Sequence, residues 1–537
     1  MAHTASTFTN IAASVSARRS KWDMPASTFT AFNAGYLVPI RCIPCLPGDH
    51  LILDQHIECR ETTLIHPVMD RAYVDCHWFF VPWRLVFDDY QKFFGYSESP
   101  WEESYETVLP HIDCSSGFSE LSVADYIGIP PGVTYSQIGS NENRKTINHL
   151  QFRSYAKIWN DWWRSEVTQP AVDIPTDGVT DEIAHVGGDP YLTAVFGGDL
   201  LPVNKLHDMF TSGTPEPQKG AEIHLPLALS GQTPPFVLSS PYSTGNLFAK
   251  TDGSVIFQAD AGSPMMNEGE LTLDNEFLSS LTGPTVNALR QSIALQQILE
   301  SDSRQGSRYV EYCRAAFGVT VPDFRSNRSE YVGGRTIRLG VNQVVQTSST
   351  DGVSPQANLA AYSATFDNSS PMTYAALEHG YLICVACVRN KNSYQNGLER
   401  QFTVRRRFDI YDPRLANIGD VPVRNDQIFM SGSVLLDEET FNYNEAWLEY
   451  RYLPDMVTGP MRSGYSGGSL DVWHYADDYS TTPTFGDAWL RSSPTNIDRT
   501  IAVSHELEPQ FRFLLEMRFQ KTSCMPLYSI PGGLTHF

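Results

Sequence analysis

The sequence predicts a mainly β protein in which one β core is interrupted by large loops that contain helices. Aromatic residues make up 12% of the 537 residues, and 34 Pro and 37 Gly are spread along the chain, a mixture that favours strands joined by long ordered loops. Apolar residues account for 41%, so we expect a sizeable core. Strand patterns lie towards both ends of the chain and helical patterns in its middle, which indicates one core with insertions.

The N-terminal part of the expected core consists of three β-prone runs separated by turn residues. In the third run, side chains alternate between an apolar and a mixed face, as in a half-buried strand. Proline and glycine within Leu46–Asp49 and before Val68 mark the turns. We therefore predict strands over Tyr36–Cys42, Leu51–Glu61 and Ala72–Val81.

Three helices are predicted in the middle of the chain. An apolar stripe at helical spacing predicts an amphipathic helix between His149 and Glu166. Pro284 precedes a second helical pattern and Gly318 follows a third, and these residues suit a helix start and a helix end. The stripe comprises Tyr155, Ile158, Trp159 and Trp162, and the second and third helices cover about Thr285–Glu300 and Arg308–Phe317.

The least periodic region lies between the first two helices, at about Thr211–Gly283, and is rich in Pro, Gly, Ser and Thr. A loop of this length is usually functional or disordered. The short apolar runs Ile223–Leu229 and Val255–Gln258 indicate an insertion with strands of its own. After Gly380 the strand pattern resumes. We predict strands over Tyr381–Val388, Gln401–Tyr411, Gln427–Leu436, Ala446–Tyr452 and Pro509–Lys521.

The net charge of −22 opposes wholesale wrapping of nucleic acid, so any contact with DNA has to be local. The first 22 residues contain no Asp or Glu, but they carry the candidate DNA contacts Arg18, Arg19 and Lys21. Two interpretations remain open for this segment. It is either an organellar transit peptide, which has a similar composition, or a flexible arm that contacts a polyanion within an assembly.

A second basic cluster, Arg405–Arg407, lies in one of the predicted C-terminal strands. Its side chains suit two partners, the phosphates of DNA and carboxylates at a subunit interface, and the 61 acidic residues favour the interface. The same alternative applies to Arg325, Arg328, Arg335 and Arg338, which follow the third helix.

The sequence motifs give little support for a metal site or a catalytic site. Two Cys-x-x-Cys pairs occur, but Cys384 and Cys387 lie within one strand-like run, where positions three apart point to opposite faces. We therefore expect buried thiols, and the odd total of nine cysteines suits a reducing compartment. No nucleophile elbow, phosphate loop or dinucleotide motif occurs in a suitable context, so we predict no enzyme and assign no cofactor. Acidic clusters at Asp88–Asp89, Asp173–Glu182 and Asp477–Asp478 are expected to be solvated loops.

Several segments resemble the major capsid proteins of the Microviridae, particularly those of the gokushovirus branch. The most specific is Cys524–Gly532, followed by His536 and Phe537, which is similar to the terminal signature of that family. The resemblance covers most of the chain outside Thr211–Gly283. Further similar segments, in chain order, are Asn33–Pro39 with Leu46–Asp49, Phe79–Leu85, Phe152–Arg164, Asn287–Gln291, Phe317–Val319, Glu330–Gly334 and Glu449–Tyr452.

This resemblance implies an eight-stranded viral jelly-roll β-barrel over residues 31–537, with an interior, partly flexible arm over residues 1–30. It also implies a sixty-copy T=1 shell that assembles through pentamers around circular single-stranded DNA in the host bacterial cytoplasm. Residues 211–283 correspond to a surface protrusion at the three-fold axis that meets a host surface receptor. The implied partners are a small basic DNA-binding protein, a scaffolding protein and a DNA pilot protein, with no membrane insertion.

Two other classes remain open. The many Trp and Tyr residues and the acidic loops also suit a carbohydrate-binding or hydrolytic β-sandwich. A spike or decoration protein would share the fold but would not close a shell by itself. The assembly state separates these alternatives.

Overall fold

The described parts of the chain form two compact units. The first combines parts of Met1–Pro217 and Gly306–Phe537, and the second lies within Gln218–Gln305. This division differs from the single domain expected over residues 31–537, because Gln218–Gln305 makes most of its contacts within itself. The computed structural model describes residues 19–96, 107–114, 116–134, 145–178, 188–221, 223, 236–239, 246–249, 255–258, 270–273, 286–306, 308–347, 357–368 and 370–528.

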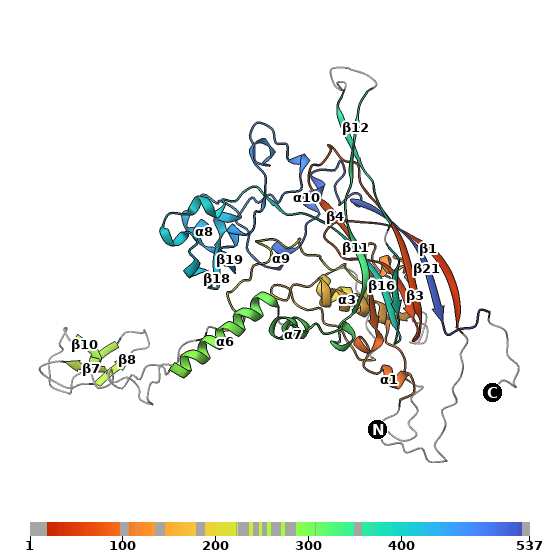
Figure 1. Cartoon of the computed structure of the whole chain (residues 1–537), viewed down its shortest axis with the longest axis horizontal. Coiled ribbons are helices and arrows are strands. Elements are labelled where there is room, and N and C mark those ends of the chain that lie inside the picture. The colour runs from red at the N-terminus through yellow and green to blue at the C-terminus, as the bar shows by residue number, and fades with distance from the viewer. Residues whose placement is uncertain are drawn as a thin grey trace, which may run out of the picture. The chain divides into compact units, whose positions relative to one another are not determined.

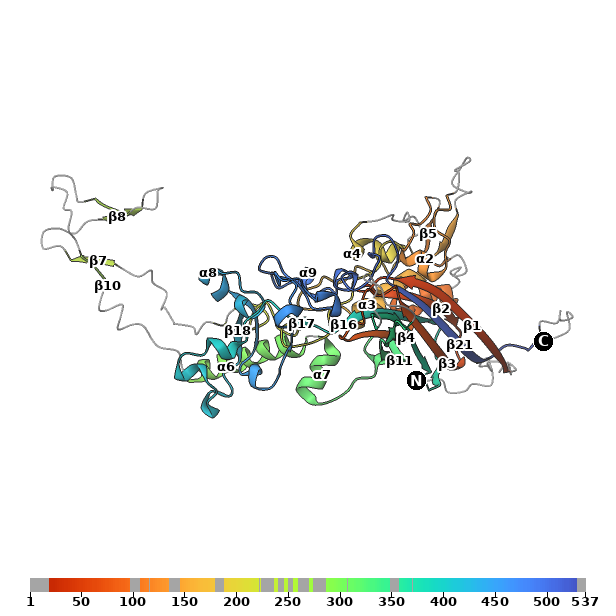
Figure 2. The same ribbon diagram turned by 90° about the horizontal axis from the view of Figure 1, so that it is seen from above.

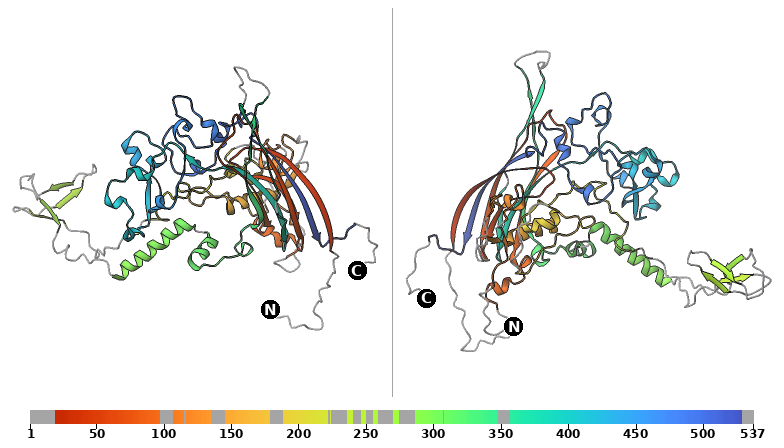
Figure 3. Two further views of the ribbon diagram at one scale, coloured as in Figure 1. Left: turned by 45° about the horizontal axis from the view of Figure 1, so that its top comes forward. Right: turned by 180° about the vertical axis from the view of Figure 1, so that it is seen from behind.

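The first large sheet holds the first and last described strands side by side, drawn in red and blue in Figure 3. They pair antiparallel from Ser20 with Ser523 to Phe32 with Phe511. Side chains of the last strand alternate between the core and the solvent, as the strand period requires. The order of the sheet is β1 (Ser20–Phe32), β21 (Phe511–Ser523), β3 (His50–Glu61) and β14 (Thr365–Asn368), and β15 (Met372–Ala375) also pairs with β3.

Strand β1 corrects the boundary of the N-terminal arm expected over residues 1–30. Residues 20–30 pair with β21 and therefore belong to the sheet. The apolar alternation of β1 is weak because it lies at the edge of the sheet, where only Phe32 is fully buried. Residues 1–18, including the candidate Arg18, lie outside the described residues.

The second large sheet is buried on both faces at its centre. In β16 every residue except Arg389 is buried, which explains why its sequence is a continuous apolar run. All neighbouring strands in this sheet are antiparallel. Their order is β11 (Glu330–Arg338), β4 (Ala72–Pro82), β16 (Gly380–Asn390) and β2 (Val38–Cys45).

One hydrophobic core fills the space between the two sheets, which face each other in Figure 1. Trp78 of β4 and Phe513 of β21 both belong to this core. Inside it, Trp78 Nε1 donates a hydrogen bond of 2.7 Å to Gln55 Oε1 of β3. The rings of Phe80 in β4 and Tyr374 in β15 lie 5.0 Å apart. The two antiparallel sheets therefore form a sandwich, as the prediction of a mainly β core requires.

Helix α3 (Leu150–Trp162) lies beside the other face of the second sheet, as Figure 2 shows. The ring of Trp162 is 5.3 Å from that of Phe79. Phe79 lies between Trp78 and Phe80 in β4, so its side chain points to the opposite face of the sheet. Tyr155 is fully buried, and its hydroxyl donates to the carbonyl oxygen of Leu37 at 2.6 Å. The helix predicted between residues 149 and 166 is therefore confirmed, and its aromatic stripe covers the sheet.

Five predicted strands and both other helices are confirmed, with ends shifted by a few residues. The strands are β2, β3, β4, β16 and β21. The helices are α6 (Val286–Gln305) and α7 (Tyr309–Phe317), and the latter ends at Gly318, whose φ of 67° is left-handed.

Three predicted strands are wrong, and all lie between β16 and β21, in residues 391–510, here called the long connection. Side chains bond to the backbone there and close short helical turns in place of a strand ladder. Asp409 Oδ2, for example, accepts hydrogen bonds from the backbone N–H groups of Arg405 and Arg406 at 3.0 and 2.8 Å. The wrong predictions are Gln401–Tyr411, Gln427–Leu436 and Ala446–Tyr452, where the structure has the 3₁₀ turns Arg400–Thr403, Arg407–Asp409, Asn425–Gln427 and Leu448–Tyr450 and helix α8 (Val434–Glu438).

The remaining strands and α-helices of the first unit are short and lie outside the two large sheets. The paired strands are β5 (His111–Asp113) with β6 (Thr146–Asn148), β12 (Val341–Val345) with β13 (Leu359–Ser363), β17 (Ser393–Tyr394) with β20 (Asp455–Met456), and β18 (Asp420–Arg424) with β19 (Thr440–Glu445). The helices are α1 (Tyr90–Phe93), α2 (Val123–Ile127), α4 (Pro190–Thr193), α9 (Asp487–Leu490) and α10 (Thr495–Asp498).

The second unit, Gln218–Gln305, overlaps the insertion expected over residues 211–283 but has different bounds. Residues 211–217 belong to the first unit, and α6 belongs to the second. The predicted strand at Val255–Gln258 is β9, whereas Ile223–Leu229 lies outside the described residues except for Ile223. The strand pairs of this unit are β7 (Phe236–Ser239) with β10 (Glu270–Leu273) and β8 (Asn246–Ala249) with β9.

Candidate nucleic-acid contacts and subunit surfaces

Arg19 and Lys21 stand where the chain enters β1, at one end of the sandwich. Both side chains are exposed, and Arg19 Nη1 donates to the carbonyl oxygen of Gly48 at 3.3 Å. Beside them, Lys521 Nζ lies 2.7 Å from the carboxylate of the fully buried Asp49. Within the described residues neither Arg19 nor Lys21 forms an ion pair, so both charges are available to an anion.

Arg405, Arg406 and Arg407 occupy an exposed turn of the long connection and not a strand. The turn is fixed by Asp409, whose pKa is lowered because its carboxylate accepts backbone N–H groups from Arg405 and Arg406. In the part of the chain that the structure describes, none of the three guanidinium groups is ion-paired. Arg19 and Lys21 lie at the start of β1, whereas this turn belongs to the long connection, so the basic candidates fall on two separate elements.

The other arginines singled out after α7 have different surroundings. Arg335 Nε pairs with Asp367 Oδ2 at 2.9 Å. The guanidinium of Arg328 lies 3.6 Å from the ring centre of Trp162, and burial lowers its pKa. Intramolecular contacts therefore engage these two, whereas Arg325 and Arg338 remain exposed.

The cysteine pairs do not form a joint site. Cys384 Sγ lies 3.5 Å from Cys76 Sγ, whereas Cys387 Sγ lies 3.6 Å from Asp75 Oδ2. Burial raises the pKa of Cys42 to about 12, so this thiol holds its proton at neutral pH. Among the residues described here, no group of three or more His, Cys, Asp or Glu side chains is arranged to hold a metal ion. In the same residues, no helix is long and apolar enough to cross a membrane.

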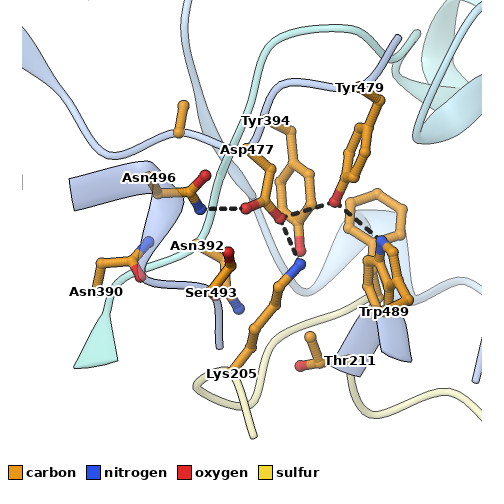
Figure 4. A network of polar contacts seen from close by, with 12 residues as sticks. Lys205, Thr211, Asn390, Asn392, Tyr394, Asp477, Tyr479, Trp489, Ser493 and Asn496 are labelled. Carbon is orange, nitrogen blue, oxygen red and sulfur yellow. Dashed lines mark hydrogen bonds and ion pairs between the residues drawn. The ribbon is translucent and has the colours of Figure 1, made fainter. Parts of the chain in front are cut away.

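A buried polar network holds the long connection, and the sequence patterns do not reveal it (Figure 4). Lys205 Nζ lies 2.5 Å from Asp477 Oδ2, although 272 residues separate them in the chain. The hydroxyl of Tyr479 donates to the same oxygen at 2.7 Å, and Trp489 Nε1 donates to that hydroxyl at 2.9 Å. Asn496 Nδ2 donates to the other carboxylate oxygen at 2.5 Å.

This network corrects the expectation that the acids at Asp477–Asp478 are solvated. Burial alone would raise the pKa of Asp477, but the charge of Lys205 and the hydrogen bonds outweigh burial and lower it. Lys205 also lies 4.6 Å from the ring centre of Trp489, so the ammonium group gains a cation–π contact. Asp478 is exposed, as expected. In the sequence, the acidic pair Asp477–Asp478 is the feature that points to this network.

The other acidic loops have ordinary surroundings. Asp88 is exposed and accepts a hydrogen bond from Thr176 Oγ1 at 2.6 Å, and Asp89 pairs with Lys92 at 3.2 Å. Part of Asp173–Glu182 and the terminal signature from residue 529 onwards lie outside the described residues.

Comparison with known proteins identifies the family of the chain. The model of the family described as "Capsid protein (F protein)" matches residues 10–533. "Capsid protein VP1" of Spiroplasma virus 4 is 36% identical over 96% of this chain and 95% of the relative. The proteins of the same name from Bdellovibrio phage phiMH2K and Chlamydia phage 1 are 34% and 31% identical, over 98% and 96% of this chain and 97% and 96% of the relatives.

These matches extend from the segment before β1 to the residues after β21, so they include the sandwich, the long connection and the second unit. They agree with the resemblance noted in the sequence, and the mainly β fold is consistent with them. The chain therefore belongs to the capsid protein (F protein) family, the capsid proteins of the single-stranded-DNA bacteriophages of the Microviridae.

Proposed function

We propose that this capsid protein assembles through pentamers into a closed T=1 shell of sixty copies around a circular single-stranded DNA genome. The observation that carries the proposal is the order in which the strands alternate between the two large sheets. A structural subunit acts through its contacts, so we assign it no catalytic residue and no cofactor. Closed symmetry requires that each copy presents the same complementary surfaces and that the rotation between neighbouring copies closes.

The two large sheets suit an eight-stranded jelly roll. Strands β14 and β15 pair with successive parts of β3 and count as one interrupted strand. In chain order, β1, β3, β14/β15 and β21 belong to the first sheet, and β2, β4, β11 and β16 to the second. Successive strands thus lie in alternate sheets, except that β4 and β11, which follow one another in this series, are neighbours in the second sheet. This alternation is the pattern of two Greek keys folded into a jelly roll.

Basic residues at the end of the sandwich are the proposed contacts with the genome. Arg18, Arg19 and Lys21 precede or begin β1, and an arm on the inside of the shell would bring them to DNA phosphates. For Arg405–Arg407, the exposed turn suits a subunit interface better than DNA. The net charge of −22 leaves most genome neutralisation to another protein, which we propose is a small basic DNA-binding protein of the same phage.

Further partners belong to the same proposal. The insertion over residues 211–283 would form a protrusion at the three-fold axis and contact a host surface receptor. A scaffolding protein and a DNA pilot protein would take part in assembly in the bacterial cytoplasm, and the protein would end in the virion. The separate compact unit at Gln218–Gln305 supports a distinct role for this part of the chain.

Sedimentation velocity with negative-stain imaging tests the proposal without assuming any activity. For a 60.1 kDa chain, pentamers would have a mass of about 300 kDa and shells about 3.6 MDa. Nuclease-protected DNA within the shells would support genome enclosure. A monomer that persists with the scaffolding partners present would overturn the proposal in favour of a glycan-binding sandwich. Association only with pre-formed shells would favour a decoration protein.

A further inference from the structure

An apolar pocket of about 410 Å³ opens in the long connection. Tyr450, Tyr452 and Met456 contribute to its wall, and the ion pair between Arg400 and Glu449, at 3.2 Å, lies at its lining. Removal of one buried leucine side chain leaves a cavity of roughly 150 Å³. The pocket therefore has room for two large aliphatic side chains.

The basic turn lies directly at this pocket. Val404 and Ile410, the residues on either side of the turn, both line the pocket. The guanidinium groups of Arg405 and Arg407 between them are exposed, and each is without an ion pair among the described residues. An apolar cavity beside unneutralised positive charge suits an occupant that is apolar and acidic.

Helix α8 presents such a segment on the surface of the same chain. Val434 is 70% exposed and Leu435 is 81% exposed, which is unusual for adjacent aliphatic side chains. Leu436 comes next, and the acidic residues Asp437, Glu438 and Glu439 follow it. Asp437 is used internally, because its Oδ1 accepts hydrogen bonds from Ser431 N and Oγ at 2.8 and 2.7 Å and so fixes the helix start.

Glu438 and Glu439 are exposed, and no ion pair of either occurs among the described residues. The acidic end of α8 is therefore free to meet positive charge. Because Leu435 is so exposed within its own chain, it does not fill the pocket of that chain. A second copy of the chain offers a matching surface, because it carries the same pocket and basic turn.

We propose that α8 of one copy inserts Leu435 into the pocket of a neighbouring copy, with Glu438 and Glu439 against Arg405 and Arg407. This inference rests on the proposed function, because it describes one contact between subunits of the assembly. Each copy carries both halves of the contact, so the contact can repeat from copy to copy and forms a ring when the rotation between copies closes. Apolar burial would supply affinity, and the charges would fix the register and exclude wrong contacts.

Charge reversal in the full-length protein tests the contact. The first variant is Arg405→Glu/Arg407→Glu, which retains Arg406 because its charge interacts with Asp409. The second is Glu438→Arg/Glu439→Arg. We expect each to lower the assembled fraction by about tenfold in sedimentation velocity, since like charges would then face each other.

The combined variant carries both reversals, and it should recover assembly to within about twofold of the parent protein. The matched control is Arg41→Glu/Arg314→Glu, which reverses two exposed arginines outside the long connection and should assemble like the parent. Circular dichroism of the unassembled chains establishes that every variant is folded.

An apolar test is independent of these charges. Leu435→Asp should block assembly, whereas Leu507→Asp, at a site 83% exposed, should not. The contact is overturned if Leu435→Asp or either reversal assembles like the parent, or if the combined variant stays unassembled. If only the arginine reversal lowers assembly, another segment fills the pocket, and the proposed contact with α8 is also overturned. If the parent protein itself never assembles, the proposed function fails instead.

Discussion

The sandwich and the long connection are stabilised in different ways. Between the sheets, large apolar side chains such as Trp78 and Phe513 fill a continuous core. The long connection has a much smaller core and depends on buried polar pairs, above all Lys205 with Asp477. A regular ladder of strands tolerates little variation in shape, whereas side-chain hydrogen bonds can hold an irregular surface. The comparison indicates that the sandwich provides stability, and in our proposal the connection provides contact surfaces.

The largest effect is expected in the core of the sandwich. Trp78→Ala removes a fully buried ring and its hydrogen bond to Gln55, and should lower the free energy of unfolding by about 3–5 kcal/mol. Urea denaturation of the unassembled chain measures this. Phe29→Ala, on the solvent face of β1 with its side chain 78% exposed, is the matched control and should cost less than about 0.5 kcal/mol. Equal losses at both sites would contradict the assignment of the core.

A smaller and more local effect is expected in the long connection. Asp477→Asn leaves the ammonium of Lys205 buried without a carboxylate, which should cost about 3 kcal/mol. Hydrogen exchange should rise across residues 391–510, while β4 and β16 keep their protection. Asp478→Asn changes the exposed neighbour and should leave exchange unchanged. Loss of protection throughout the sandwich would mean that the two regions are not separately stabilised.

The junction between the two regions should respond to pH. Burial raises the pKa of Glu61, at the end of β3, to about 8, and the hydroxyl of Tyr475 in the long connection is its partner at 3.4 Å. Because the folded pKa exceeds the unfolded value of 4.5, the contribution of Glu61 is fully present below pH 4.5 and declines as pH rises to 8.

Glu61→Gln is neutral at every pH, so it should remove this decline and raise stability at pH 8 by about 1–2 kcal/mol. Urea midpoints at pH 5, 6.5 and 8 measure the effect. Glu516→Gln, which changes an exposed carboxylate on β21, should keep the decline of the parent protein. An unchanged pH profile in Glu61→Gln would count against a buried, protonated carboxyl.

The smallest effect is expected on the solvent face of the first sheet. Arg518 and Asp23 form an ion pair at 3.2 Å, with 64% and 48% of their side chains exposed. Arg518→Ala should therefore cost about 0.2–0.5 kcal/mol, and the difference should vanish in high salt. Urea midpoints at low and high salt measure it. A loss above about 1 kcal/mol would place this face among the stabilising parts of the sandwich.

The strands of the sandwich could be predicted where burial imposes a clear pattern. β16 is apolar from Tyr381 to Val388 because both of its faces are covered, and the large apolar side chains of α3 recur at helical spacing. β1 and β11 could not be predicted because they lie at sheet edges and bury one residue and none, whereas the edge strand β2 begins with three buried residues. Local pattern thus reveals the centre of a sheet better than its edges.

The long connection could not be predicted for a different reason. Arg405–Tyr411 has the composition of a strand, but one carboxylate, Asp409, satisfies two backbone N–H groups and closes a turn. Similarly, no local pattern connects Lys205 to Asp477, because their contact depends on tertiary structure alone. Basic clusters are visible in a sequence, but whether they face DNA or a subunit depends on surroundings that lie far away in the chain.

The pairing of β1 with β21 has a consequence for the time course of folding. β21 lies between β1 and β3, so neither strand can complete its pairing until residues 511–523 have left the ribosome. Contacts across such a span form late, because the long loop between them has to be closed first. A nascent or truncated chain therefore lacks a completed sandwich. Synthesis itself would keep unfinished subunits out of the growing particle.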